Sequence, residues 1–151
     1  MQKLNLQLMI YGHGLADGKK QVSDQIIRLK LEDKVILGDF PPQTDSLLAG
    51  ASVLVMPSQA YESFGLTIVE AMAFGVPVVT TDVGGMSEVL GDSKAGYVCS
   101  KDSPLEFATA IKSILGDPVE TTGNPYLYDW VLALSSAINI PIVKFVGMVR
   151  Q

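Results

Sequence analysis

Short apolar segments alternate along this chain with segments in which apolar residues recur at helical spacing. The strand-like segments are residues 6–11, 35–38, 53–56, 76–80 and 96–99. Helical patterns follow them near residues 23–31, from 44, from 64, around 85–90 and from 104. Five successive β–α units with short, buried strands predict an α/β fold with a doubly wound parallel sheet covered by helices.

The last of these helices has clear start and stop signals. Ser103 is placed to cap the helix, Pro104 suits its first turn, and Glu106 stands three residues after Ser103, the spacing of a capping box. Phe107, Ile111 and Leu115 follow at helical spacing, and Gly116 predicts the end.

Glycine-containing segments follow four of the predicted strands. They are 12–14, 38–40, 57–65 and 82–85. Ligands of parallel sheets bind beyond the carboxyl ends of the strands, so we expect these four segments to meet at one edge and to form the binding site.

The segment 61–79 carries the most specific chemistry. Glu62 lies in a predicted loop, Gly65 opens an apolar helix, and Glu70 follows Glu62 with seven residues between them. The first N–H groups of a helix have no partner within it and favour an anion, and glycine allows close approach to the backbone. Carboxylates beside such a site can accept hydrogen bonds from sugar hydroxyls. The pattern predicts a site for a sugar that carries phosphate.

Six fragments, in this order along the chain, resemble one enzyme family. They are YGHG at 11–14, VILG at 35–38, MPS at 56–58, ESFGLTIVEAMAFGVPVV at 62–79, DVGG at 82–85 with Glu88, and AGYV at 95–98 with Asp102. This set is similar to that of the retaining glycosyltransferases of family 4 (glycosyl transferases group 1), in their C-terminal, Rossmann-like donor-binding domain of the GT-B fold. The resemblance covers about residues 6–117.

The resemblance implies a role for each matching residue. It implies that Glu62 faces the donor sugar and stabilises positive charge at the anomeric carbon, and that Glu70 accepts hydrogen bonds from the ribose hydroxyls. The implied backbone contacts to sugar and diphosphate come from Phe64, Gly65, Leu66, Gly84 and Gly85. Gly12 and Gly14 would shape the turn after the first strand, and the backbone of Phe40 would lie near the base.

Each of these residues also has an ordinary structural interpretation. Glu62 could be a solvated loop acid, Phe40 a core aromatic, and the Gly84–Gly85 pair a plain loop. Glu70 sits in a mostly apolar helix, where a buried acid would need a partner. His13, the only histidine, is interpreted as a tolerated residue between two glycines. Two carboxyls could also indicate a glycoside hydrolase, but that depends on their separation.

Composition narrows the class of protein. The 151 residues suffice for one domain with a real core, 48% of them are apolar, and the net charge of −5 argues against a nucleic-acid partner. Cys99 is the only cysteine, so no intrachain disulfide and no zinc ligand set is expected. No apolar run reaches the length of a membrane span. We expect a cytoplasmic protein, with peripheral membrane attachment of the complete enzyme left open.

Positive charge is missing from the stretch that carries the site. No lysine or arginine occurs between Lys34 and Lys94. Backbone N–H groups and helix dipoles contribute only about 0.3–1 kcal/mol each when exposed, which is little for a diphosphate. The chain therefore needs a cation from elsewhere to bind this group firmly.

Compared with the family that it resembles, the chain is expected to lack an N-terminal acceptor domain and the first β–α unit. In the family, an arginine and a lysine of that unit bind the diphosphate. We expect a partial donor-binding domain at 1–118 and an atypical apolar tail at 119–151 that packs on the domain or mediates self-association. Such a chain would be a fragment, a truncated product or one subunit of a split enzyme.

The expected ligand is a nucleotide-diphosphate sugar, with no cofactor and no metal, and the expected partner is the missing N-terminal domain or subunit. The alternative function is a non-catalytic module for nucleotide-sugar binding or assembly. A dehydrogenase half is disfavoured, because no Gly-x-Gly-x-x-Gly sequence follows a strand.

Overall fold

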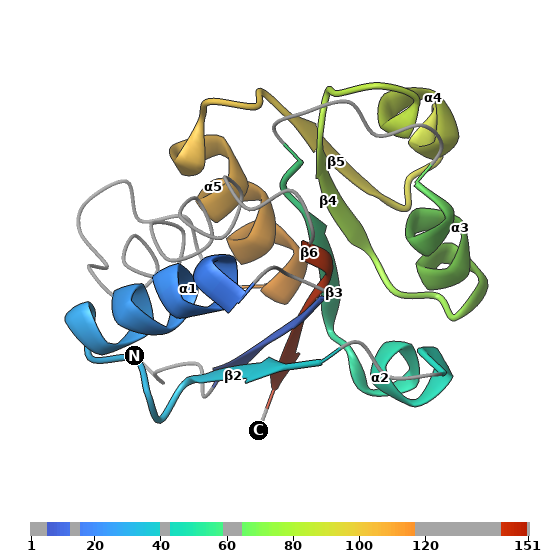
Figure 1. Cartoon of the computed structure of the whole chain (residues 1–151). Coiled ribbons are helices and arrows are strands. Elements are labelled where there is room, and N and C mark those ends of the chain that lie inside the picture. The colour runs from blue at the N-terminus through green and yellow to red at the C-terminus, as the bar shows by residue number, and fades with distance from the viewer. Residues whose placement is uncertain (1–5, 13–15, 40–42, 59–64, 117–142, 151) are drawn as a thin grey trace.

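The described part of the chain folds around one six-stranded sheet, seen in the computed structural model in Figure 1. The structure describes residues 6–12, 16–39, 43–58, 65–116 and 143–150. The strands lie in the order β2-β1-β6-β3-β4-β5. Their bounds are Leu6–Gly12 (β1), Val35–Gly38 (β2), Val53–Met56 (β3), Val78–Thr81 (β4), Gly96–Cys99 (β5) and Val143–Arg150 (β6). The first five match the predicted strands closely, because each is a short run of mostly apolar residues of high β-propensity.

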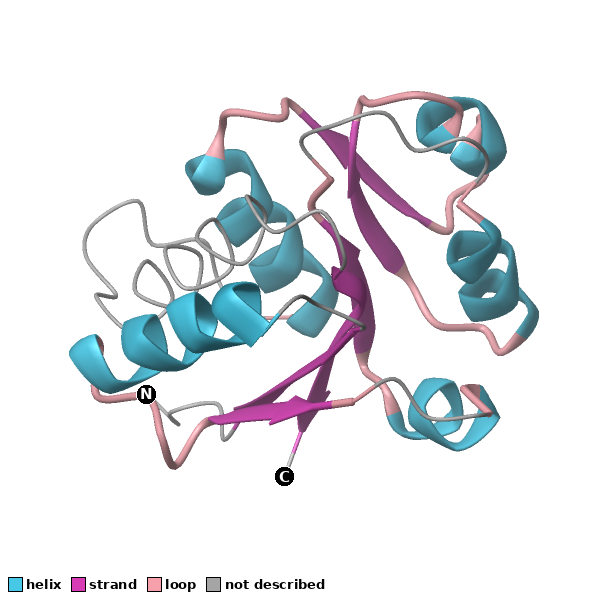
Figure 2. Cartoon of the chain, in the orientation of Figure 1, coloured by secondary structure: helices cyan, strands magenta, loops and turns pink. Residues whose placement is uncertain are grey.

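Helices cover both faces of the sheet, as Figures 1 and 2 show. Their bounds are Ala16–Arg28 (α1), Asp45–Gly50 (α2), Leu66–Ala73 (α3), Met86–Leu90 (α4) and Pro104–Leu115 (α5). Helices α1 and α5 lie on one face, and α2, α3 and α4 lie on the other. This confirms the doubly wound α/β fold.

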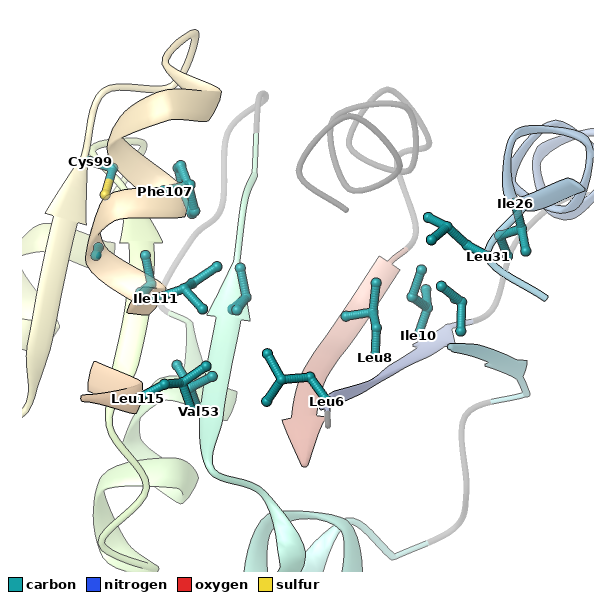
Figure 3. Close-up of a cluster of buried hydrophobic side chains, with 14 of the residues drawn as sticks. Leu6, Leu8, Ile10, Ile26, Leu31, Val53, Cys99, Phe107, Ile111 and Leu115 are labelled. Carbon is teal, nitrogen blue, oxygen red and sulfur yellow. The ribbon is translucent and has the colours of Figure 1, made fainter. Parts of the chain in front are cut away.

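Each face has its own apolar core. The core under α1 and α5 joins strands from both halves of the sheet: Leu8 and Ile10 from β1, Val53 from β3, and Phe107 and Ile111 from α5 (Figure 3). The core under the other three helices is built on Leu48, Leu54, Ile68 and Met86, together with Val78. Leu8, Leu48, Leu54, Ile68 and Ile111 are fully buried, so burial of apolar surface holds the helices to both faces.

Strand β6 interrupts an otherwise parallel arrangement. Strands β1 and β2 are parallel, and so are β3, β4 and β5. Strand β6 lies between β1 and β3 and runs antiparallel to both, with Ile10 opposite Val146 on one side and Val55 opposite Val146 on the other. Residues 143–150 of the segment interpreted as a tail therefore form a central strand. Residues 117–142 lie outside the described part of the chain.

Two helix termini differ from the sequence predictions. Helix α1 begins at Ala16, well before the predicted start near residue 23, because Gly18 is accommodated inside the helix and Asp17 in the first turn complements its dipole. At α5, Ser103 makes no side-chain capping hydrogen bond. Glu106 instead accepts hydrogen bonds from the backbone N–H of Ser100 at 2.7 Å and from its hydroxyl at 3.1 Å.

Candidate functional site

The carboxyl ends of the parallel strands meet at one edge of the sheet. Gly12 ends β1, Asp39 follows β2, Ser58 lies just after β3 and Asp82 directly follows β4. Strands β1 and β3 point the same way, because both are antiparallel to β6. The described parts of the four glycine-containing segments therefore lie at the same edge, as the alternation of strands and helices predicted.

Gly65 gives this edge a helix N-terminus that the backbone can present to a ligand. It is the N-cap of α3, with φ 64° and ψ 48° in the left-handed region, and its carbonyl accepts a hydrogen bond from the N–H of Ile68 at 2.8 Å. A Cβ on Gly65 would lie 3.2 Å from Cδ1 of Ile68 and 3.3 Å from Cγ of Met86. Both the conformation and the packing therefore favour glycine.

Glu70 is exposed on α3, which corrects the expectation of a buried acid in an apolar helix. The reason is its place on the helix, since Ile68 and Ala71 face the core. The hydroxyl of Thr44 donates to Oε2 of Glu70 at 3.4 Å. Thr44 occupies the N-cap position of α2, but its side chain makes no capping hydrogen bond. An exposed carboxylate next to a hydroxyl at this edge is suited to accept hydrogen bonds from a polyol.

A buried hydroxyl fixes the backbone just after β3. Thr81, at the carboxyl end of β4, is fully buried, and its hydroxyl donates to the carbonyl of Ser58 at 2.7 Å. Ser58 is the last described residue before the segment that carries Glu62. Sequence reasoning missed this contact, because a threonine in an apolar strand reads only as a β-branched residue.

Gly84 and Gly85 lie close by, between β4 and α4. Gly84 has φ 61°, a left-handed conformation that favours glycine, and Gly85 is the N-cap of α4. The predicted pair therefore stands at a turn that leads into a helix at the carboxyl edge. Its role as a backbone donor to a ligand stays a prediction.

A cation and an aromatic ring, neither predicted from the sequence, also lie here. Lys19 of α1 forms an ion pair with Asp39, which follows β2. The ring of Tyr11 lies against β2, since a Cβ on Gly38 would lie 2.6 Å from its Cε1. Lys19 lies at this edge because α1 begins at Ala16. The sequence pattern placed the start of this helix near residue 23 and therefore did not predict the position of Lys19.

Several predicted site residues lie outside the described residues. They are Gly14, Phe40, Glu62 and Phe64, together with His13. Of the others, the structure brings Gly12, Gly65, Glu70, Gly84 and Gly85 to one edge, and Leu66 begins α3 there with a largely exposed side chain.

Among the described residues, the titratable groups whose pKa is clearly shifted, Cys99 and Glu106, lie on the α5 side of the sheet. Burial, helped by the carboxylate of Glu106, raises the pKa of the Cys99 thiol to about 11. The N–H and the hydroxyl of Ser100 lower the pKa of Glu106. Burial, the nearby carboxylate and local hydrogen bonds therefore explain both pKa shifts.

The described residues contain neither a metal-ligand cluster nor a membrane-spanning helix. In these ranges no three His, Cys, Asp or Glu side chains are grouped so that they could hold a metal ion. No described helix is long and apolar enough to cross a membrane.

Solved structures with this fold contain nucleotides. The chain is similar to Anabaena Alr3699/HepE in complex with UDP, with a TM-score of 0.64 and 27% identity over 87% of this chain and 34% of that one. It is also similar to the complex of Alr3699/HepE with UDP-glucose, with a TM-score of 0.60 and 29% identity, over 80% and 30% of the two chains.

Sequence relatives are transferases. The chain is 30% identical to the phosphatidyl-myo-inositol mannosyltransferase of Mycobacterium tuberculosis over 90% of this chain and 38% of the relative. It is 35% identical to the D-inositol 3-phosphate glycosyltransferase of Arthrobacter sp. over 76% and 28%. The chain thus spans well under half the length of these relatives. The family model described as glycosyl transferases group 1 matches residues 1–125. The chain belongs to the glycosyl transferases group 1 family.

Proposed function

We propose that this chain is the donor-binding part of a retaining glycosyltransferase and binds a nucleoside-diphosphate sugar at the carboxyl edge of its sheet. The observation that carries the proposal is the combination of Gly65, which opens α3, with Glu70 on the same helix. Relatives of this fold hold UDP and UDP-glucose, which supports a uridine nucleotide as the first donor to test.

The helix N-terminus and the acid have different tasks. The backbone N–H groups at the start of α3, with those at Gly84 and Gly85, bind diphosphate oxygens and place them in the positive end of the helix dipole. Glu70 accepts hydrogen bonds from the ribose hydroxyls, because its carboxylate is exposed and, within the described part of the chain, accepts only a long hydrogen bond from Thr44. The ribose therefore competes easily for this carboxylate.

Glu62 is proposed as the catalytic residue of the site, acting as an ionised carboxylate. It stands in the segment that begins after Ser58, whose carbonyl Thr81 fixes. As the bond to the nucleoside diphosphate breaks, positive charge builds on the anomeric carbon, and a carboxylate that faces the sugar stabilises it. Transfer needs no metal in this proposal, since helix N-termini and cations stabilise the leaving diphosphate.

Sugar transfer also requires an acceptor held against the donor. Orientation of two substrates accounts for about 7–11 kcal/mol of barrier reduction in well-aligned systems. The chain matches only 38% of the mannosyltransferase. We therefore propose that an acceptor-binding domain or subunit completes the enzyme, and that this chain alone binds donor without transferring it, in the cytoplasm.

Calorimetry with UDP and with uridine tests the binding proposal. The full chain should bind UDP, and Glu70→Ala should weaken binding about tenfold or more, because a hydrogen bond to a charged group contributes about 1.5–3 kcal/mol. The matched control is Glu32→Ala, which removes an exposed acid between α1 and β2, at the opposite edge of the sheet.

Two results would count against the proposal. Absence of UDP binding by the folded chain would remove the donor site. An equal loss of affinity in the Glu70 and Glu32 variants would show that the loss does not depend on the position of Glu70 at this edge.

A further inference from the structure

Strand β6 lies at the point where the order of the parallel strands in the sheet reverses. From β1 the chain proceeds to β2 on one side, and from β3 it proceeds to β4 and β5 on the other. In open α/β sheets, ligands bind beyond the carboxyl ends of the strands at such a reversal. Here β6 stands between β1 and β3, and because it is antiparallel, its first residues lie at the carboxyl ends of these two neighbours.

The register gives Lys144 a special position. Tyr11 is opposite Phe145, but the next residue of β1, Gly12, is opposite Val143, so Lys144 is an additional residue on β6. On the other side the ladder reaches Val55 opposite Val146, one residue before β3 ends at Met56. A bulge of this kind breaks the local ladder and is frequent beside functional sites. Lys144 is therefore at the carboxyl edge, between the ends of β1 and β3.

Positive charge is scarce at this edge. Lys19 is paired with Asp39, and Lys20 is paired with Asp24 one turn further along α1. Lys101 follows β5, which lies three strands away from β6, or about 14 Å at the usual strand spacing. Residues 35–93 contain acids but no lysine or arginine. Among the described residues, Lys144 is thus the lysine whose backbone lies at the reversal itself.

We propose that Lys144 supplies the cation for the diphosphate of the donor. The inference rests on the proposed function and deepens it, because it assigns the phosphate charge to a residue of the central antiparallel strand. The position at a bulge between Gly12 and the end of β3 carries the argument. A lysine here complements the two phosphates, whereas the backbone donors of α3 alone would leave most of their charge unmatched.

The same strand offers a matched control. Arg150 is opposite Leu6, at the amino edge of β1, so it is a cation on β6 at the far end from the site. Lys144→Gln should weaken UDP binding about tenfold, the equivalent of one charge-assisted hydrogen bond. It should leave uridine binding unchanged and flatten the salt dependence of UDP binding. Lys144→Arg and Arg150→Gln should keep the preference for UDP over uridine.

A footprint on the unaltered chain makes the test independent of variant folding. Trace reductive methylation, read by mass spectrometry, should show Lys144 protected by UDP, while Lys94, at the amino end of β5, reacts equally with and without UDP. UDP binding that leaves Lys144 unprotected, or that survives Lys144→Gln unchanged, overturns this inference alone. Absence of UDP binding overturns the proposed function and this inference with it.

Discussion

Substitution of Gly65 by alanine should separate backbone strain from the role of this residue in the site. Gly65 and Gly75 flank α3 and have nearly the same left-handed conformation, with φ 64° and 69°. A Cβ on Gly75 has nothing within 4 Å, whereas a Cβ on Gly65 meets Ile68 and Met86. Gly75→Ala is therefore a control that carries the strain without the contacts.

Backbone strain and overpacking set the expected losses in the free energy of unfolding. A left-handed conformation costs alanine about 1–2 kcal/mol, and the reduced freedom of the unfolded chain offsets about 0.4–1 kcal/mol of this. Gly75→Ala should thus lower the free energy of unfolding by about 1 kcal/mol. At Gly65 the 3.2 Å and 3.3 Å contacts involve fully buried neighbours, so overpacking adds about 1–3 kcal/mol.

Urea denaturation followed by circular dichroism measures the two free energies of unfolding, and calorimetry measures UDP affinity. Each kcal/mol corresponds to about 2–4 °C in melting temperature for a chain of this size. Gly65→Ala should be the less stable variant and should bind UDP more weakly, while Gly75→Ala binds as the wild type does. Equal stabilities together with equal affinities would refute the packing argument and the assignment of Gly65 to the site.

Three further predictions concern groups around the site and the core. Thr81→Val should cost about 1–3 kcal/mol, because it leaves the carbonyl of Ser58 without its donor, and Thr81→Ser should restore most of this in urea titrations. Glu106 has a lowered pKa through its bonds to Ser100, so its stabilisation is present above the ordinary value of 4.5 and is lost as pH falls through the lower folded-state pKa. Glu106→Gln should therefore flatten the acid limb of a stability–pH curve, and an unchanged limb would contradict the assignment. The Cys99 thiol, with a pKa of about 11, should react slowly with a disulfide reagent until urea unfolds the chain, and rapid reaction in the native state would be inconsistent with its burial.

The fold was accessible from the sequence because its signals are local. Each of the first five strands is a short, mostly apolar run, and Gly12 and Gly38 stand where β1 and β2 end. Gly116, predicted to end α5, adopts the left-handed conformation at φ 70° that favours glycine. The convergence of the loops at one edge followed from the alternation of strands and helices alone.

The parts that the sequence did not predict depend on contacts between distant segments. No local pattern shows that β6 enters between β1 and β3, since strand neighbours are chosen by the whole sheet. The ion pair of Lys19 with Asp39 and the bond from Thr81 to Ser58 join residues about 20 positions apart. The predicted capping bond from Ser103 does not form, and Glu106 accepts hydrogen bonds from the N–H and the hydroxyl of Ser100 before the helix.

Amide chemical shifts measured during a UDP titration of the ¹⁵N-labelled chain report directly where on the sheet the nucleotide binds. If the donor site lies at the carboxyl edge, the largest changes occur there, at Gly12, Gly65 and Gly84. Residues at the opposite edge, such as Lys34 and Ala95, should keep their shifts. Changes concentrated at the amino ends of the strands, or none at saturating UDP, would contradict a donor site at this edge.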